Sequence, residues 1–309
     1  MAAGALDEIR KLNELYECID VAVSGTADRK TEERLEKVYR GANASAEHAM
    51  SKRGLYPVPE GVERLRVETI DPEETGGLIG GYTSGGPVTI NESIIPGTRS
   101  YGRFRNWMNK QRGHFSRYLY EKFGTDESAA ESVRYTIGHE TLHNKTQLRP
   151  MRTYDGKETQ PFAEALIERL SDRYSENLPK GAKWLGKFMA HMTYKPLLEG
   201  LNEVASENVF NGEGTQAVKE KRSRGPTSYD AFASAAAGAL GKIGYEEKMD
   251  PYYTAMDFYG DWSQKPGRML DRYIDGFFES YASNGKGGCA GGGACYSMAP
   301  VQACLLKAA

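Results

Sequence analysis

Strand-like patterns are confined to one short stretch of this 309-residue chain, and helical patterns fill most of the rest. Residues 64–69 alternate apolar and charged side chains, as a half-buried strand does. Residues 76–91 are rich in glycine around a Ser84-Gly-Gly-Pro87 turn, which predicts two short strands in a hairpin at a sheet edge. Because strand signals vanish after Gly181, the sequence predicts an α+β protein with a small mixed or antiparallel sheet followed by a mainly helical lobe.

The helical patterns divide the chain into four segments. The predicted boundaries are a helical segment at residues 1–55, a lobe containing the sheet at residues 56–178, a helical lobe at residues 179–284 and a glycine- and cysteine-containing tail at residues 285–309. Apolar spacing predicts helices at residues 6–23, 35–42, 101–123, 127–146, 161–177, 184–201, 229–243 and 269–281.

Charge and hydropathy narrow the classes of partner. The chain has 40 basic and 42 acidic residues, so its net charge of −2 argues against a nucleic-acid partner recruited by bulk charge. No apolar run approaches the roughly 18 to 20 residues that span a bilayer, and the first ten residues lack the pattern of a secretory signal. We therefore expect no nucleic-acid partner, no membrane partner and a cytoplasmic location.

The motif His139-Glu-Thr-Leu-His143 lies inside a predicted helix. Histidines four residues apart on a helix project from the same face and can bind one metal ion. Zinc is the expected metal, since two imidazoles and a carboxylate leave a fourth position for water. Glu140 then lies beside the metal, where it can take a proton from that water and pass it to the leaving amine.

The third ligand is expected from the helix at residues 161–177, where acidic residues recur every four positions. We assign Glu164 as the ligand and Glu168 as the outer acceptor that holds a histidine ring nitrogen. A second register, with Glu168 as the ligand and Asp172 as the outer acceptor, stays open at this stage.

These motifs resemble those of gluzincins, the zincin metallopeptidases that pair His-Glu-x-x-His with a downstream glutamate. Twenty residues separate His143 from Glu164, a gap similar to that in thermolysin-like enzymes, and the resemblance covers residues 65–177. It implies a two-lobed zincin-like fold, a zinc cofactor and hydrolysis of a peptide or protein substrate. It also implies that residues 88–91 form the edge strand that binds the peptide through main-chain hydrogen bonds.

Gluzincins usually place a tyrosine or histidine over the oxyanion, and here no motif identifies it. The candidates are His191 and Tyr194, with four further tyrosines behind them. Those four are Tyr252, Tyr253, Tyr273 and Tyr281.

Three of the four cysteines lie in the tail, at Cys289, Cys295 and Cys304. The tail could be a disordered end, could return a thiolate to the metal of its own chain, or could pair by redox chemistry or with a partner. An alternative function for the whole chain is a zincin-fold binding or structural module of a larger assembly, which binds metal without turnover.

Overall fold

The computed structural model describes residues 2–26, 28–58, 61–71, 80–176, 178–223, 225, 227–245 and 254–283. The protein is mixed α/β, mostly helical, and divides into two compact units, Met1–Tyr154 and Asp155–Ala309. The cysteine-containing tail, Tyr252 and Tyr253 lie outside the described residues.

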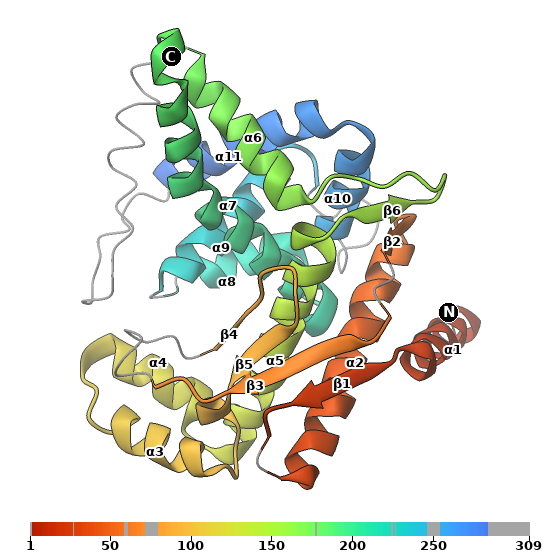
Figure 1. Cartoon of the computed structure of the whole chain (residues 1–309), viewed down its shortest axis with the longest axis vertical. Coiled ribbons are helices and arrows are strands. Elements are labelled where there is room, and N and C mark those ends of the chain that lie inside the picture. The colour runs from red at the N-terminus through yellow and green to blue at the C-terminus, as the bar shows by residue number, and fades with distance from the viewer. Residues whose placement is uncertain are drawn as a thin grey trace. The chain divides into compact units, whose positions relative to one another are not determined.

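The first unit contains a four-stranded mixed sheet in the order β1-β3-β5-β4 (Figure 1). β1 pairs with β3 and β3 with β5 in parallel, whereas β4 runs antiparallel to β5, with Gly81 opposite Ile90. A separate antiparallel pair joins β2 and β6. The strands are β1 Val21–Ser24, β2 Leu55–Pro57, β3 Glu63–Glu68, β4 Gly81–Tyr82, β5 Val88–Asn91 and β6 Met151–Thr153.

Two strand predictions need correction. Residues 88–91 are not the edge strand: β5 lies between β3 and β4, and all four of its residues are buried. The edge position next to β5 belongs to β4, the first strand of the predicted hairpin. The helix predicted to reach residue 23 ends at Cys18, because Val21–Ser24 pairs with β3 instead.

The helices of the first unit pack around this sheet. α5 packs against β4 and β5, as predicted for the helix that carries His139, and it also packs against α2. The single helix predicted at residues 101–123 is two helices, because the chain is extended at Arg112 between them. The α-helices are α1 Ala2–Cys18, α2 Arg29–Ser51, α3 Arg99–Met108, α4 Gly113–Phe123 and α5 Asp126–Leu142.

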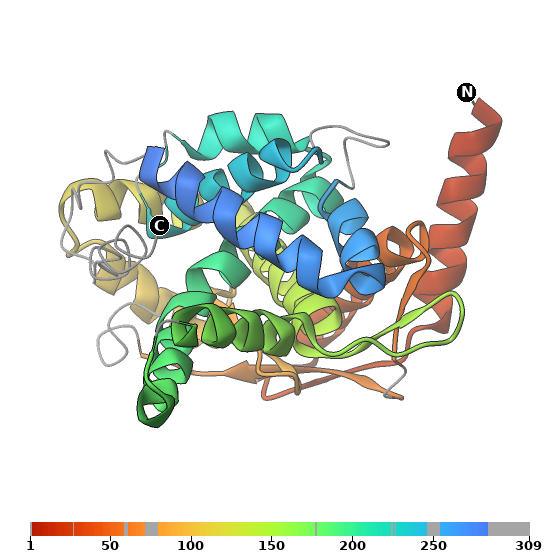
Figure 2. The same ribbon diagram turned by 90° about the horizontal axis from the view of Figure 1, so that it is seen from above.

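The elements of the second unit, within its described residues, are all helices, as the vanishing strand signals predict. α11 packs along α9, and a Cβ at Gly276 would lie 3.1 Å from the Cα of Ala239 (Figure 2). At Gly200, α7 approaches α9 so closely that a Cβ would lie 2.4 Å from the carbonyl oxygen of Phe232. The α-helices are α6 Phe162–Ser175, α7 Lys183–Asn211, α8 Thr215–Arg222, α9 Ser228–Lys242, α10 Thr254–Gln264 and α11 Pro266–Ser283.

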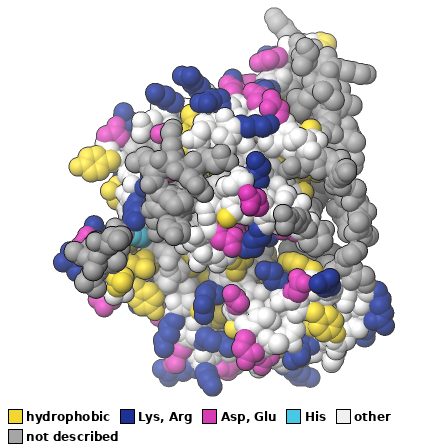
Figure 3. Space-filling model, turned by 180° about the vertical axis from the view of Figure 1, so that it is seen from behind, with side chains coloured by type: hydrophobic (Ala, Val, Ile, Leu, Met, Phe, Trp, Pro, Cys, Tyr) yellow, Lys and Arg dark blue, Asp and Glu magenta, His cyan; other side chains and the backbone are white. Residues whose placement is uncertain are grey.

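Among the described residues, every helix is too short or too polar to cross a membrane. On the face shown in Figure 3, basic and acidic side chains of the described residues are interspersed.

Candidate metal centre

Helix α5 begins at a well-formed cap and carries the motif in its last turn. The hydroxyl of Thr125 accepts a hydrogen bond from the backbone N–H of Ser128 at 3.1 Å, and the Ser128 hydroxyl accepts one from the N–H of Thr125. The α-helix ends at Leu142 and continues as a π-helix over His143–Leu148. Such π-helical turns are rare and occur frequently at functional sites.

The two histidines of the motif are buried and lie side by side. Their ring centroids are 4.8 Å apart, and their exposed fractions are 7% for His139 and 4% for His143. The Nδ1 atom of His143 lies 2.6 Å from the side-chain oxygen of Gln147. Since a carboxamide oxygen only accepts, the tautomer that fits this contact carries its proton on Nδ1, and Nε2 is then the ring nitrogen that can bind a metal.

Gln147 therefore performs for His143 the orienting role that we predicted for Glu168. Sequence reasoning missed it, although the spacing from His143 to Gln147 is the same four residues that join the two histidines.

Glu140 follows His139 in the motif. Its side chain is buried and lies against the edge strand β4. A Cβ at Gly81 would lie 3.3 Å from the Cγ of Glu140 and 2.5 Å from the carbonyl oxygen of Thr89. Only glycine fits there without a shift of the backbone or of the Glu140 side chain. The structure thus brings the carboxylate-bearing side chain of the motif to strand β4.

Side chains from the π-helical segment and from the residue after it bind backbone carbonyl oxygens of the hairpin turn. Asn144 donates to the carbonyl oxygen of Gly86 at 3.0 Å, and Arg149 donates to the carbonyl oxygen of Gly85 at 3.2 Å. Gly85 has a φ of +85°, which favours glycine. The same short segment therefore positions His143 and the hairpin that contains β4.

A buried lysine anchors this segment to the rest of the first unit. The Nζ atom of Lys145 donates to Glu47 on α2 and to Glu63 on β3, each at 2.8 Å, and the side chain is 1% exposed. Pairing with two carboxylates offsets the cost of burying the ammonium group.

The predicted third ligand lies on α6, in the second unit. Glu164 and Glu168 are both exposed, as is Asp172, whereas the three motif residues are buried. The neighbouring Arg169 makes two hydrogen bonds to Asp271 on α11, at 2.6 and 2.5 Å. On this part of α6, Arg169 therefore links α6 to α11 within the second unit.

The oxyanion candidates lie on α7. His191 is exposed and Tyr194 is half-buried, with ring centroids 6.1 Å apart. Of the other tyrosines, Tyr273 is fully buried and its hydroxyl donates to the carbonyl oxygen of Leu197 at 2.8 Å. Burial raises the pKa of Tyr273 well above 10. Tyr281 is half-buried.

The second half of α7 also carries acidic residues four positions apart. Glu199 is half-buried, and the next two, Glu203 and Glu207, are buried. Arg222 on α8 binds both buried carboxylates and also binds Asp230 at 2.8 Å. Glu203 and Glu207 are thereby engaged in ion pairs inside the second unit.

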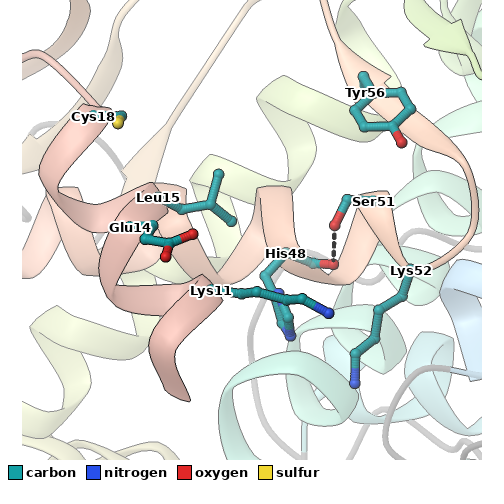
Figure 4. A pocket seen from close by; sticks show the side chains of 8 residues that line it. All are labelled: Lys11, Glu14, Leu15, Cys18, His48, Ser51, Lys52 and Tyr56. Carbon is teal, nitrogen blue, oxygen red and sulfur yellow. Dashed lines mark hydrogen bonds between the residues drawn. The ribbon is translucent and has the colours of Figure 1, made fainter. Parts of the chain in front are cut away.

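A separate hollow of about 440 Å³ lies in the first unit between α1, α2 and β2 (Figure 4). It contains none of the predicted site residues. Its lining residues are Lys11, Glu14, Leu15, Cys18, His48, Ser51, Lys52 and Tyr56.

Comparison of the chain with protein-family models, with curated proteins and with solved structures finds no match.

Proposed function

We propose that the protein is a zinc-dependent metallopeptidase in which His139 and His143 bind the metal and Glu140 is the general base. The observation that carries this proposal is the pair of buried imidazoles, 4.8 Å apart, beside a buried glutamate on the same helix. The donor set fits zinc, because imidazole nitrogens and a carboxylate are its usual ligands and Gln147 already orients the ring of His143.

For the third ligand we propose Glu199 in place of Glu164. Support comes from donor chemistry, because the two imidazoles of His139 and His143 together with the carboxylate of Glu199 could hold a metal ion. The exposure of Glu164 and Glu168 also favours this choice, since metal ligands need fixed positions. The ion pair of Glu203 with Arg222 leaves Glu199 as the better candidate among the acids of α7.

The chemistry follows from the roles of these residues. A bound zinc ion lowers the pKa of a coordinated water toward neutrality. Glu140 would act as the general base that takes a proton from the attacking water and as the acid that passes it to the leaving amine. His191 or Tyr194 remains our prediction for the group that stabilises the oxyanion.

The peptide would add to the sheet at β4. Among the described strands, β4 has a neighbour on one side only, so its other edge is available for main-chain hydrogen bonds. A small mixed sheet with an antiparallel edge strand, and the motif helix packed against that strand, supports a zincin-like architecture.

The test uses the purified full-length chain, elemental analysis and a mixed peptide library. We expect one zinc ion per chain, cleavage products, loss of cleavage with a chelator and its return when zinc is added. Zinc without products would favour the alternative, a metal-binding structural module.

The ligand assignment has its own test. Glu199→Ala should weaken zinc binding by more than about a hundredfold, beyond the usual effect of an outer residue. Glu164→Ala and Glu168→Ala serve as matched controls and should leave zinc affinity unchanged. Loss of zinc in either control variant, with zinc binding retained in Glu199→Ala, would show that the third ligand lies on α6.

A further inference from the structure

The first half of α7 carries three large apolar side chains to the surface. Trp184, Phe188 and Met192 are 69%, 54% and 56% exposed. Their four-residue spacing places them in one row along the helix. Isolated exposed apolar residues are ordinary, whereas a row of three on one helix marks an interaction surface.

Packing against α6 fixes which face of α7 is exposed. A Cβ at Gly186 would lie 3.0 Å from the carbonyl oxygen of Ser171, so α6 and α7 are in close contact there (Figures 1 and 2). Ala190 and Thr193 are buried, and the hydroxyl of Tyr174 on α6 donates to that of Thr193 at 3.2 Å. The helix cannot rotate to bury the apolar row without breaking this contact.

A row of basic residues runs beside the apolar row. Lys183, Lys187 and Lys195 are exposed, and each lies one residue before a position in the register of the apolar row. Residues 177–198 contain four lysines and neither aspartate nor glutamate. A chain with a net charge of −2 thus has a strongly basic segment at its exposed apolar row.

We propose that this face of α7 docks the protein onto an anionic lipid bilayer surface. Tryptophan and phenylalanine enter the boundary between headgroups and acyl chains, while lysines beside them reach the lipid phosphates. Charge complementarity favours an acidic surface, and the basic and apolar rows lie together as an interfacial helix requires.

This proposal does not depend on the metal site, and it revises the expectation of no membrane partner. That expectation rested on the lack of a spanning segment, which does not bear on a helix lying in the plane of a membrane surface.

The chain offers a matched control for charge. On α3, Arg99 and Arg103 are two further exposed basic residues, four positions apart, with no exposed apolar row beside them. Tyr229 on α9, 50% exposed, provides the control for an exposed aromatic side chain.

The experiment is flotation of the full-length chain with vesicles of phosphatidylcholine alone, or with about one lipid in three replaced by phosphatidylserine. We expect at least about tenfold stronger binding to the anionic vesicles, weakening as salt is raised. Lys183→Glu with Lys187→Glu, and separately Trp184→Ala with Phe188→Ala, should each reduce binding at least about tenfold. Arg99→Glu with Arg103→Glu, and Tyr229→Ala, should bind as the parent chain does.

Tryptophan fluorescence adds a second readout. Anionic vesicles should shift the emission to shorter wavelength in the parent chain and not in Trp184→Ala, since Trp262 is buried and the half-buried Trp107 lies on α3, which is not part of the proposed docking face. Circular dichroism confirms that each variant is folded. Absent vesicle binding, equal binding to neutral vesicles, or an equal loss in the α3 variant would overturn the proposal. Binding to an acidic polypeptide but not to vesicles would also overturn it, in favour of a protein partner.

Discussion

Each unit of the protein contains a basic side chain held by carboxylates, but only the cluster in the first unit lies on the segment that carries His143. Lys145 pairs with Glu47 and Glu63 in the first unit. Arg222 pairs with Glu203, Glu207 and Asp230 in the second. Buried charge alone therefore does not identify a functional site.

The difference lies in what the neighbouring polar groups bind. Beside Lys145, the imidazole of His143 is held by the neutral carboxamide of Gln147, a contact that orients a metal-binding histidine. In the second unit, the buried carboxylates of Glu203 and Glu207 are bound by a guanidinium group, so they stabilise the fold. The type of bonding partner therefore distinguishes a candidate metal ligand from a carboxylate that belongs to a structural ion pair.

The largest effect that tests this comparison is loss of the metal. His139→Ala or His143→Ala should abolish stoichiometric zinc binding, because the remaining ligands make a poor tetrahedral site. Elemental analysis after gel filtration measures it, with His191→Ala as the control that keeps zinc. Full zinc occupancy in both motif variants would refute the ligand assignment.

The next effect separates chemistry from binding. Glu140→Gln should keep the metal and lower peptide turnover by at least about a hundredfold, because the general base is lost. Glu131→Gln, on the exposed face of the same helix, should cleave at the parent rate. Near-parental turnover in Glu140→Gln would contradict the assigned role.

The cluster in the second unit should respond in stability and not in zinc content. Arg222→Met removes the cation shared by Glu203, Glu207 and Asp230 and should lower the free energy of unfolding by up to about 3–5 kcal/mol. Lys221→Met, at a half-exposed neighbour, should cost at most about 1 kcal/mol. Chemical denaturation of both variants measures the difference, and unequal zinc content between them would break the comparison.

The smallest effect concerns the orienting residue. Gln147→Ala should weaken zinc binding by about 10- to 100-fold, as removal of an outer partner of a ligand histidine usually does. Competition with a chromogenic chelator measures it, and Gln111→Ala on the loop after α3 is the control. Unchanged affinity in Gln147→Ala would show that the contact does not orient the ring for metal.

Local signals predicted much of the fold. The cap at Thr125, the hairpin around residues 84–87 and the helical second half depend on residues close in sequence, and the structure confirms them. The strand β1 was missed because Val23 also fits the helical spacing of Leu15 and Ile19. Only pairing with β3, about 40 residues away, decides between the two.

The position of β5 was also beyond local reasoning. Alternation predicts a strand, but its neighbours depend on sheet order, and β3 occupies the side of β5 that an edge strand would leave open.

The site was predictable only within one helix. His139, Glu140 and His143 are four residues or fewer apart, so helical geometry alone relates them. The third ligand is distant in sequence, and acids four residues apart occur both at Glu164 and Glu168 on α6 and at Glu199 and Glu203 on α7. Burial and ion pairs, which distinguish these helices, are properties of the folded chain.

The central claim is that the motif helix holds zinc, and anomalous diffraction at the zinc edge from crystals of the zinc-loaded chain tests it most directly. We predict one peak per chain, with a nitrogen of His139, a nitrogen of His143 and an oxygen of Glu199 at about 2.0–2.2 Å from it. A zinc-loaded crystal with no peak within bonding distance of His139 and His143 would contradict the account.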